Sequence, residues 1–221
     1  MKQQVVVIGL GRFGSAVATE LSRLGHDVLG VDSRLTTVQA LSGELSHVVQ
    51  ADATDEESLA RLNLAEFDAA VVGITDNLET SILTTLLLKH LGLKRVVAKA
   101  RDKMHGEILA LVGADRVVYP ERETGLRVAH TWTSADVTDS LDVIPGYTIS
   151  RASVPEALVG QTIARAITER GINVSLLLLA RGERVTVYPS ASETLRAGDT
   201  LMIAGALPDI ERFFTSLSPP A

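Results

Sequence analysis

Short apolar runs recur through the first half of the chain and alternate with longer segments in which apolar positions follow a helical period. Runs of about four to eight β-branched residues are typical of strands buried on both faces of a sheet. Strands that alternate with helices of about ten or more residues predict a doubly wound parallel sheet, the α/β class. The predicted strands are 4–8, 27–31, 47–50, 69–73, 95–99 and 116–118, with helices at 12–24, 34–44, 55–63, 77–91 and 103–113.

The pattern changes after Pro120, where a further helix is predicted over 121–133. A polar stretch at 133–136 and the turn Pro145-Gly146 then indicate a domain boundary. Beyond it the pattern predicts a small α+β unit, so we expect two domains, 1–134 and 135–221. The predicted elements of the second domain are strands at 147–154, 174–180, 185–188 and 200–204 and helices at 162–170 and 208–217.

Composition narrows the class of protein. Of the 221 residues 46% are hydrophobic and only 4% aromatic, which suits helices packed on a parallel sheet. The formal net charge is -6 with no basic block, which argues against a nucleic-acid partner. Cysteine is absent, which excludes disulfides, thiolate catalysis and cysteine-based metal sites. Because no apolar run approaches about 18 residues and the first strand leaves no room for a signal peptide, we expect a soluble protein.

The first strand runs directly into the glycine-rich segment Gly-Leu-Gly-Arg-Phe-Gly, residues 9–14. Gly9 permits the tight turn, Gly11 lets a ligand phosphate approach the backbone, and Gly14 permits close helix–strand packing. The next strand ends at Asp32, whose carboxylate would accept both ribose hydroxyls and favour an unphosphorylated 2′ position. The arrangement predicts a Rossmann-like nucleotide site; a structural glycine turn without a ligand is the alternative.

Arg12 departs from an ordinary dinucleotide site. A cation in the first turn of a helix is disfavoured by the dipole, by ~0.3–1 kcal/mol. Either the arginine bends into water, or it meets a ligand with more negative charge than the dipole alone would hold. A triphosphate fits the second interpretation, with the neighbouring Phe13 also in the predicted site.

Further polar residues follow the ends of strands three to five, where a doubly wound sheet binds its ligands. Asp52, Ala53 and Thr54 would read the adenine edge, with helix capping as the alternative for Asp52 and Thr54. Thr75 and Asn77 would meet ribose or phosphate. Lys99 and Arg101 would meet phosphates, with a surface role as the alternative for Arg101.

Glu121 opens the helix after Pro120, where an acid suits the dipole or reaches a divalent cation held by ligand phosphates. The five histidines have no metal-ligand spacing, and no nucleophile elbow or acid/base pair is evident. We therefore expect no catalytic residues and no enzymatic activity.

These motifs resemble the RCK domains of bacterial potassium-uptake systems, closest to the KtrA-type cytosolic subunit. The resemblance lies in residues 7–14, 50–54, 81–89 and 113–121, and in the tail at 183–189 and 197–205, which is similar to the C-terminal RCK (TrkA-C) subdomain. TrkA-type proteins usually carry two glycine fingerprints, whereas this chain has one.

The resemblance implies a cytoplasmic regulatory subunit, peripheral to the inner face of the membrane, that forms dimers and an octameric ring beneath a KtrB-like K⁺-translocating subunit. ATP and ADP would drive different ring shapes. Arg12 would contact the γ-phosphate, Asp32 the ribose, and Glu121 a divalent cation, Mg²⁺ or Ca²⁺, at the dimer interface. NAD or NADH in a TrkA-like regulator, and an NAD-dependent oxidoreductase, are the alternatives.

Some members of this family bind cyclic di-AMP in the C-terminal subdomain. Ile172 stands where a histidine is expected, so this ligand stays open. The corresponding region holds Ala164, Arg170, Asn173, Val174 and Pro189.

Overall fold

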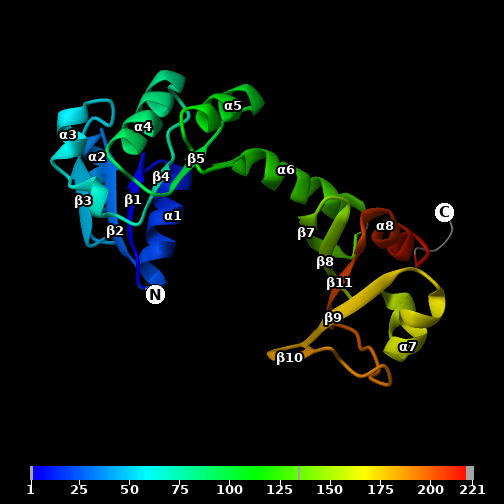
Figure 1. The fold of residues 1–221 in the computed structure, drawn as a ribbon. Helices are drawn as coiled ribbons and strands as arrows, with labels where there is room; N and C mark the ends of the chain where they lie inside the picture. The colour runs from blue at the N-terminus through cyan, green and yellow to red at the C-terminus, as the bar shows by residue number, and fades with distance from the viewer. Residues whose placement is uncertain (1, 134, 218–221) are drawn as a thin grey trace. The chain divides into compact units, whose positions relative to one another are not determined.

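The computed structural model describes residues 2–133 and 135–217, and their contacts divide the chain into two compact units, the first ending at Glu121 and the second beginning at Arg122 (Figure 1). The division lies one helix before the predicted boundary, whose residue 134 is outside the described residues. Helix α6 (Pro120–His130) has no buried residue, and its Arg127 pairs with Asp139 of the second unit at 2.8 Å. Pro120 and Glu121 therefore belong to the first unit, and the rest of the helix is grouped with the second.

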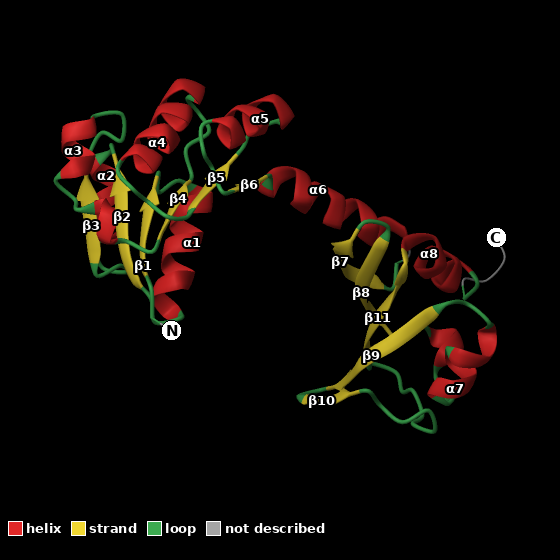
Figure 2. Ribbon diagram, viewed as in Figure 1, coloured by secondary structure: helices red, strands yellow, loops and turns green. Residues whose placement is uncertain are grey.

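The first unit contains a six-stranded parallel sheet with strand order β3-β2-β1-β4-β5-β6 (Figure 2). This confirms the predicted doubly wound fold, and the order reverses between β1 and β4, where ligands bind in such sheets. Each predicted strand is present with its ends within one residue. The strands are β1 (Gln4–Ile8), β2 (Asp27–Asp32), β3 (His47–Gln50), β4 (Ala69–Val72), β5 (Val96–Lys99) and β6 (Arg116–Val118).

Helices cover both faces of this sheet. Val5 and Val7 pack in one cluster with residues of α1 and α2, whereas Val6 and Ile8 pack in another with α3, α4 and α5. Burial on both faces explains why the strands are continuously apolar. The helices are α1 (Arg12–Arg23), α2 (Leu35–Leu41), α3 (Glu56–Ala60), α4 (Leu78–His90) and α5 (Lys103–Leu111), with a 3₁₀ turn η1 (Leu64–Glu66).

The second unit contains a five-stranded antiparallel sheet with strand order β10-β9-β11-β8-β7. Strand β7 (Val137–Ile144) was not predicted, and the interpretation of Pro145-Gly146 as a domain boundary is wrong. These two residues instead form the turn of the β7–β8 hairpin, with Gly146 at φ +81°. The other strands are β8 (Tyr147–Ser153), β9 (Val174–Arg181), β10 (Arg184–Val187) and β11 (Thr200–Ala206).

Helix α8 (Leu207–Thr215) closes the core of this unit with Ile210, Phe213 and Phe214, all buried. The two phenylalanine rings pack edge to face with centroids 5.2 Å apart. The helix predicted over 162–170 is interrupted. The short segments are η2 (Thr131–Thr133), η3 (Glu156–Leu158), α7 (Ile163–Ala166) and η4 (Thr168–Arg170).

A buried ion pair fastens the loop before β11 to strand β9. Asp199 is 1% exposed and accepts hydrogen bonds from Nε and Nη2 of Arg181, each at 2.8 Å. Arg181 also binds Glu193 at 2.9 Å and the Thr194 carbonyl at 2.9 Å. The hydrogen bonds from Arg181 hold the pKa of Asp199 below its ordinary value. One guanidinium thus joins three points of this loop.

Substitution of Arg181 with alanine is expected to destabilise the second unit by up to about 3 kcal/mol, because it leaves the Asp199 carboxylate buried without its cation. Partial exposure of Arg181 keeps the effect at the low end of the range for buried pairs. Hydrogen exchange should accelerate in β9 and β11 and not in β1. The exposed Arg184→Ala is the matched control; equal exchange in the two variants would contradict the assignment.

Candidate functional site

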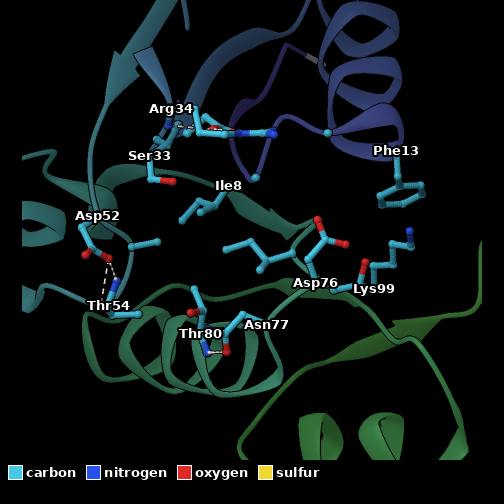
Figure 3. Close-up of a pocket in the computed structure, with 18 of the residues that line it drawn as sticks. Ile8, Phe13, Ser33, Arg34, Asp52, Thr54, Asp76, Asn77, Thr80 and Lys99 are labelled. Atoms are coloured by element: carbon cyan, nitrogen blue, oxygen red, sulfur yellow. Dashed lines mark hydrogen bonds and ion pairs between the residues drawn. The ribbon is translucent and has the colours of Figure 1, made fainter. Parts of the chain in front are cut away.

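A cavity of about 800 Å³ opens at the carboxyl ends of the parallel strands, at the point where the strand order reverses (Figure 3). Residues from the ends of β1 to β5 and from the first turns of α1, α4 and α6 line it. It therefore gathers residues that are distant in sequence. Among the predicted residues, those that line it are Gly9, Gly11, Arg12, Phe13, Asp32, Asp52, Ala53, Thr54, Thr75, Asn77, Lys99 and Glu121.

The glycine loop is shaped by close backbone packing. Gly9 has φ +84°, and a Cβ there would lie 2.7 Å from Ile74 Cγ1. A Cβ on Gly14 would lie 2.0 Å from the Gly9 carbonyl oxygen, although Gly14 itself does not line the cavity. A Cβ on Gly11 would meet nothing within 4 Å. Gly9 and Gly14 are thus required by packing, and Gly11 leaves space beside the cavity.

Asp32 is 6% exposed and ties this loop to the end of β2. Its Oδ2 accepts the backbone N–H of Leu10 at 2.8 Å, and its Oδ1 accepts the backbone N–H and Nε–H of Arg34 at 2.9 and 3.3 Å. A carboxylate offers about four acceptor positions. Three are therefore taken within the protein, and the contact of Asp32 with a ribose stays a prediction.

Two cations and one carboxylate meet at the other end of the cavity. Lys99 Nζ lies 2.6 Å from Glu121 Oε1 and 5.7 Å from the centroid of the Phe13 ring. The Lys99 side chain is 10% exposed, that of Glu121 71%. The hydrogen bond from Lys99 is the main cause that lowers the pKa of Glu121, and the charge of Arg12 adds to it.

The first turn of α1 beside these groups offers free backbone donors. Its N-cap, Gly11, provides no side-chain hydrogen bond, and no acidic residue lies in the turn. Backbone N–H groups and the positive end of the dipole favour an anion there. Together with Arg12 and Lys99, they make this the end of the cavity suited to phosphates.

Asp52 closes a turn at the end of β3. Its Oδ1 accepts the backbone N–H and hydroxyl of Thr54 at 2.9 and 2.7 Å (Figure 3), and these bonds lower its pKa. The cap of α3 is Asp55, which accepts from the N–H of Glu57, so the helix-capping alternative for Asp52 and Thr54 is wrong. Ala53 contributes its carbonyl oxygen to the Thr84 hydroxyl at 3.2 Å.

The remaining predicted residues divide between the cavity and the surface. Asn77 caps α4 by accepting the N–H of Thr80 at 3.1 Å, and Thr75 lies just before it in the lining. Arg101 pairs with Asp102 at 3.2 Å and does not line the cavity, in agreement with its surface alternative.

Sequence reasoning missed several polar residues of the lining. All follow strand ends or begin the next helix, so the same strand-end rule that located their neighbours applies to them. These residues are Ser33, Arg34, Asp76 and Thr80.

Neither a metal cluster nor a membrane-spanning helix is found among the described residues. Within residues 2–133 and 135–217, no group of three or more histidine or acidic side chains is placed to hold a metal ion. Glu121 shares the cavity lining with the carboxylates of Asp52 and Asp76, and its role toward a divalent cation stays a prediction. None of the helices described here is long and apolar enough to cross a bilayer.

The residues predicted for cyclic di-AMP lie in the second unit. The Ala164 N–H, in α7, donates to the Ala191 carbonyl at 2.9 Å, two residues beyond Pro189. The buried Nε of Arg170 has no hydrogen-bond partner among the described residues. Val174 begins β9, and Asn173 directly precedes it. The role of this region stays a prediction.

Comparison with known proteins identifies related chains. Residues 5–120 match the TrkA-N domain family. Ktr system potassium uptake protein C of Bacillus subtilis is 36% identical over 96% of this chain and 96% of its own length. Ktr system potassium uptake protein A of the same organism is 33% identical over 96% of this chain and 95% of its own length.

A solved structure, the GsuK channel bound to NAD, matches the fold with a TM-score of 0.65. It is 19% identical, and the match covers 100% of this chain and 40% of that one. At this identity the match supports the fold.

Substitution of Gly14 with alanine is expected to destabilise the first unit by about 1–3 kcal/mol, because the new Cβ would collide with the Gly9 carbonyl. Gly11→Ala is the matched control, since its Cβ meets nothing and its φ of -67° suits alanine. Hydrogen exchange in β1 and β4 should accelerate only in the Gly14 variant. Equal protection in both variants would refute the packing role of Gly14.

Proposed function

The chain belongs to the TrkA-N domain family, and we propose that it is the nucleotide-sensing regulatory subunit of a potassium uptake system. The observation that carries this proposal is the position of Glu121. It pairs with Lys99 in the cavity and lies in the first turn of α6, the helix through which the chain enters the second unit. A ligand that breaks or strengthens this ion pair can change the position or stability of the first turn of α6 without any chemical step.

The proposed ligands are ATP and ADP. Arg12 sits at the first helical position of α1, where a cation is costly unless an anion offsets it. Its proximity to Glu121 and Lys99 supports contact with a γ-phosphate. NAD or NADH is the second candidate, since a structure with this fold, the GsuK channel, is described as bound to NAD. An NAD-dependent oxidoreductase is the weaker alternative, because no acid/base pair for such chemistry is evident in the sequence.

Phosphates would compete with Glu121 for Lys99. The Lys99 ammonium is nearly buried, so it interacts strongly with whichever anion is closest. A phosphate that takes this position releases the Glu121 carboxylate. The carboxylate can then ligate Mg²⁺ or Ca²⁺ together with phosphate oxygens. ATP and ADP would differ in how well they displace Glu121 from Lys99. Each nucleotide would then shift the equilibrium between two states of the protein by the difference in its affinity for those states.

Exposed apolar residues support assembly with other chains. Helix α6 has no buried residue, and Leu126, Val128 and Trp132 are 38%, 55% and 85% exposed. Exposed apolar side chains favour protein contacts when they gather on one surface, which is the basis of the assembly proposed here. We propose a homodimer that assembles into an octameric ring on the cytoplasmic face of a KtrB-like membrane subunit, with cyclic di-AMP as a second ligand to be tested.

Arg12→Ala is expected to weaken ATP binding by about tenfold or more and ADP binding by much less, because a charge-assisted hydrogen bond to the γ-phosphate is lost. Isothermal titration of both nucleotides, with NAD⁺ and NADH alongside, measures this. Arg23→Ala, at the other end of the same helix, is the control. Equal loss for ATP and ADP would refute the γ-phosphate role, and tight NADH binding without ATP binding would replace the proposed ligand.

Glu121→Gln is expected to abolish any strengthening of ATP binding by Mg²⁺, because a neutral amide is a poor ligand for this ion. In the absence of Mg²⁺ the variant should bind ATP at least as tightly as the wild type, since Lys99 is no longer neutralised. Glu107→Gln, outside the cavity on α5, provides the control. An unchanged Mg²⁺ response in the Glu121 variant would exclude the carboxylate as a ligand.

A further inference from the structure

The pair formed by Asp32 and Arg34 bears on which ribose the cavity accepts, an inference that rests on the proposed nucleotide function. An acidic residue at the end of the second strand ordinarily selects a free 2′-hydroxyl, and a nearby arginine accommodates a 2′-phosphate. This chain has both residues, two positions apart. The choice between a free 2′-hydroxyl and a 2′-phosphate therefore depends on how the two side chains are arranged.

The arrangement neutralises the carboxylate from within the protein. Asp32 Oδ1 accepts both the backbone N–H and the Nε–H of Arg34, while its Oδ2 accepts the N–H of Leu10. Most of its acceptor capacity is used before any ligand arrives. Asp32 thus serves chiefly to hold the loop and the arginine, and its charge opposes an incoming phosphate less than that of an unpaired carboxylate.

Arg34 keeps donors for a ligand. Its side chain is 64% exposed, and Figure 3 shows it extended along one edge of the cavity. The ion pair uses Nε, and no other acidic side chain in the described part of the chain pairs with its terminal amino groups. Two such groups in a planar fork match the oxygens of a phosphate.

We propose that Arg34 is a specificity-determining residue that lets the cavity accept adenine nucleotides phosphorylated at the ribose 2′ oxygen. The guanidinium is held beside the carboxylate position that receives a ribose hydroxyl, so a phosphate ester on that oxygen lies within its reach. Asp32 without Arg34 would reject the same group by charge repulsion. The cavity therefore accepts nucleotides with a 2′-phosphate as well as those with the free 2′-hydroxyl that Asp32 alone would select.

The test compares adenosine 5′-monophosphate with adenosine 2′,5′-bisphosphate, which differ only in the 2′-phosphate, by calorimetric titration of the full chain. The wild type is expected to bind the bisphosphate at least as tightly. Arg34→Ala should lower the ratio of bisphosphate to monophosphate affinity by about tenfold or more. Arg34→Lys, a point charge without the fork, should give an intermediate ratio, and the surface variant Arg61→Ala an unchanged one.

Two results would overturn the inference while leaving the proposed function in place. One is wild-type protein that binds ATP and the monophosphate but rejects the bisphosphate. The other is a ratio that stays the same in both Arg34 variants, with circular dichroism showing them folded. A protein that binds none of the nucleotides, ATP included, would overturn the proposed function and this inference with it.

Discussion

The contact between Gly14 and the carbonyl oxygen of Gly9 sets the geometry of the cavity. A Cβ at Gly14 or at Gly73 would lie within 2.7 Å of that oxygen, so the loop, α1 and the end of β4 are packed as closely as backbone allows. The bond from the Leu10 N–H to Asp32 fixes the same loop to β2. This packing directs the first turn of α1, with Arg12, at the space where phosphates would bind.

An ion pair lies at each of the two ends of the cavity. At one end the Asp32 carboxylate is largely satisfied within the protein, and Arg34 lies beside it. At the other end the nearly buried Lys99 pairs with the exposed Glu121 in the first turn of α6. In the proposed function, the pair of Lys99 and Glu121 is the part of the cavity that reports the phosphate state of the nucleotide.

The sequence predicts the first unit well, since strands buried on both faces read as apolar runs and glycine and aspartate positions follow strand ends. Strand β7 escaped prediction because it is an edge strand with two bulges, and only Val137 and Ser140 along it are buried. Arg34 is an exposed arginine without a periodic signal, and only its place after the end of β2 points to the cavity. The pairing of Lys99 with Glu121, 22 residues apart, depends on the tertiary fold.

Hydrogen exchange in the first turn of α6, measured with saturating ATP and with saturating ADP in the presence of Mg²⁺, tests the central claim most directly. If the cavity senses the phosphate state through Glu121, the two nucleotides will protect the glycine loop alike and residues 120–125 differently. Identical protection of residues 120–125 by both nucleotides, with the cavity occupied in each case, would contradict a sensor that acts through this helix.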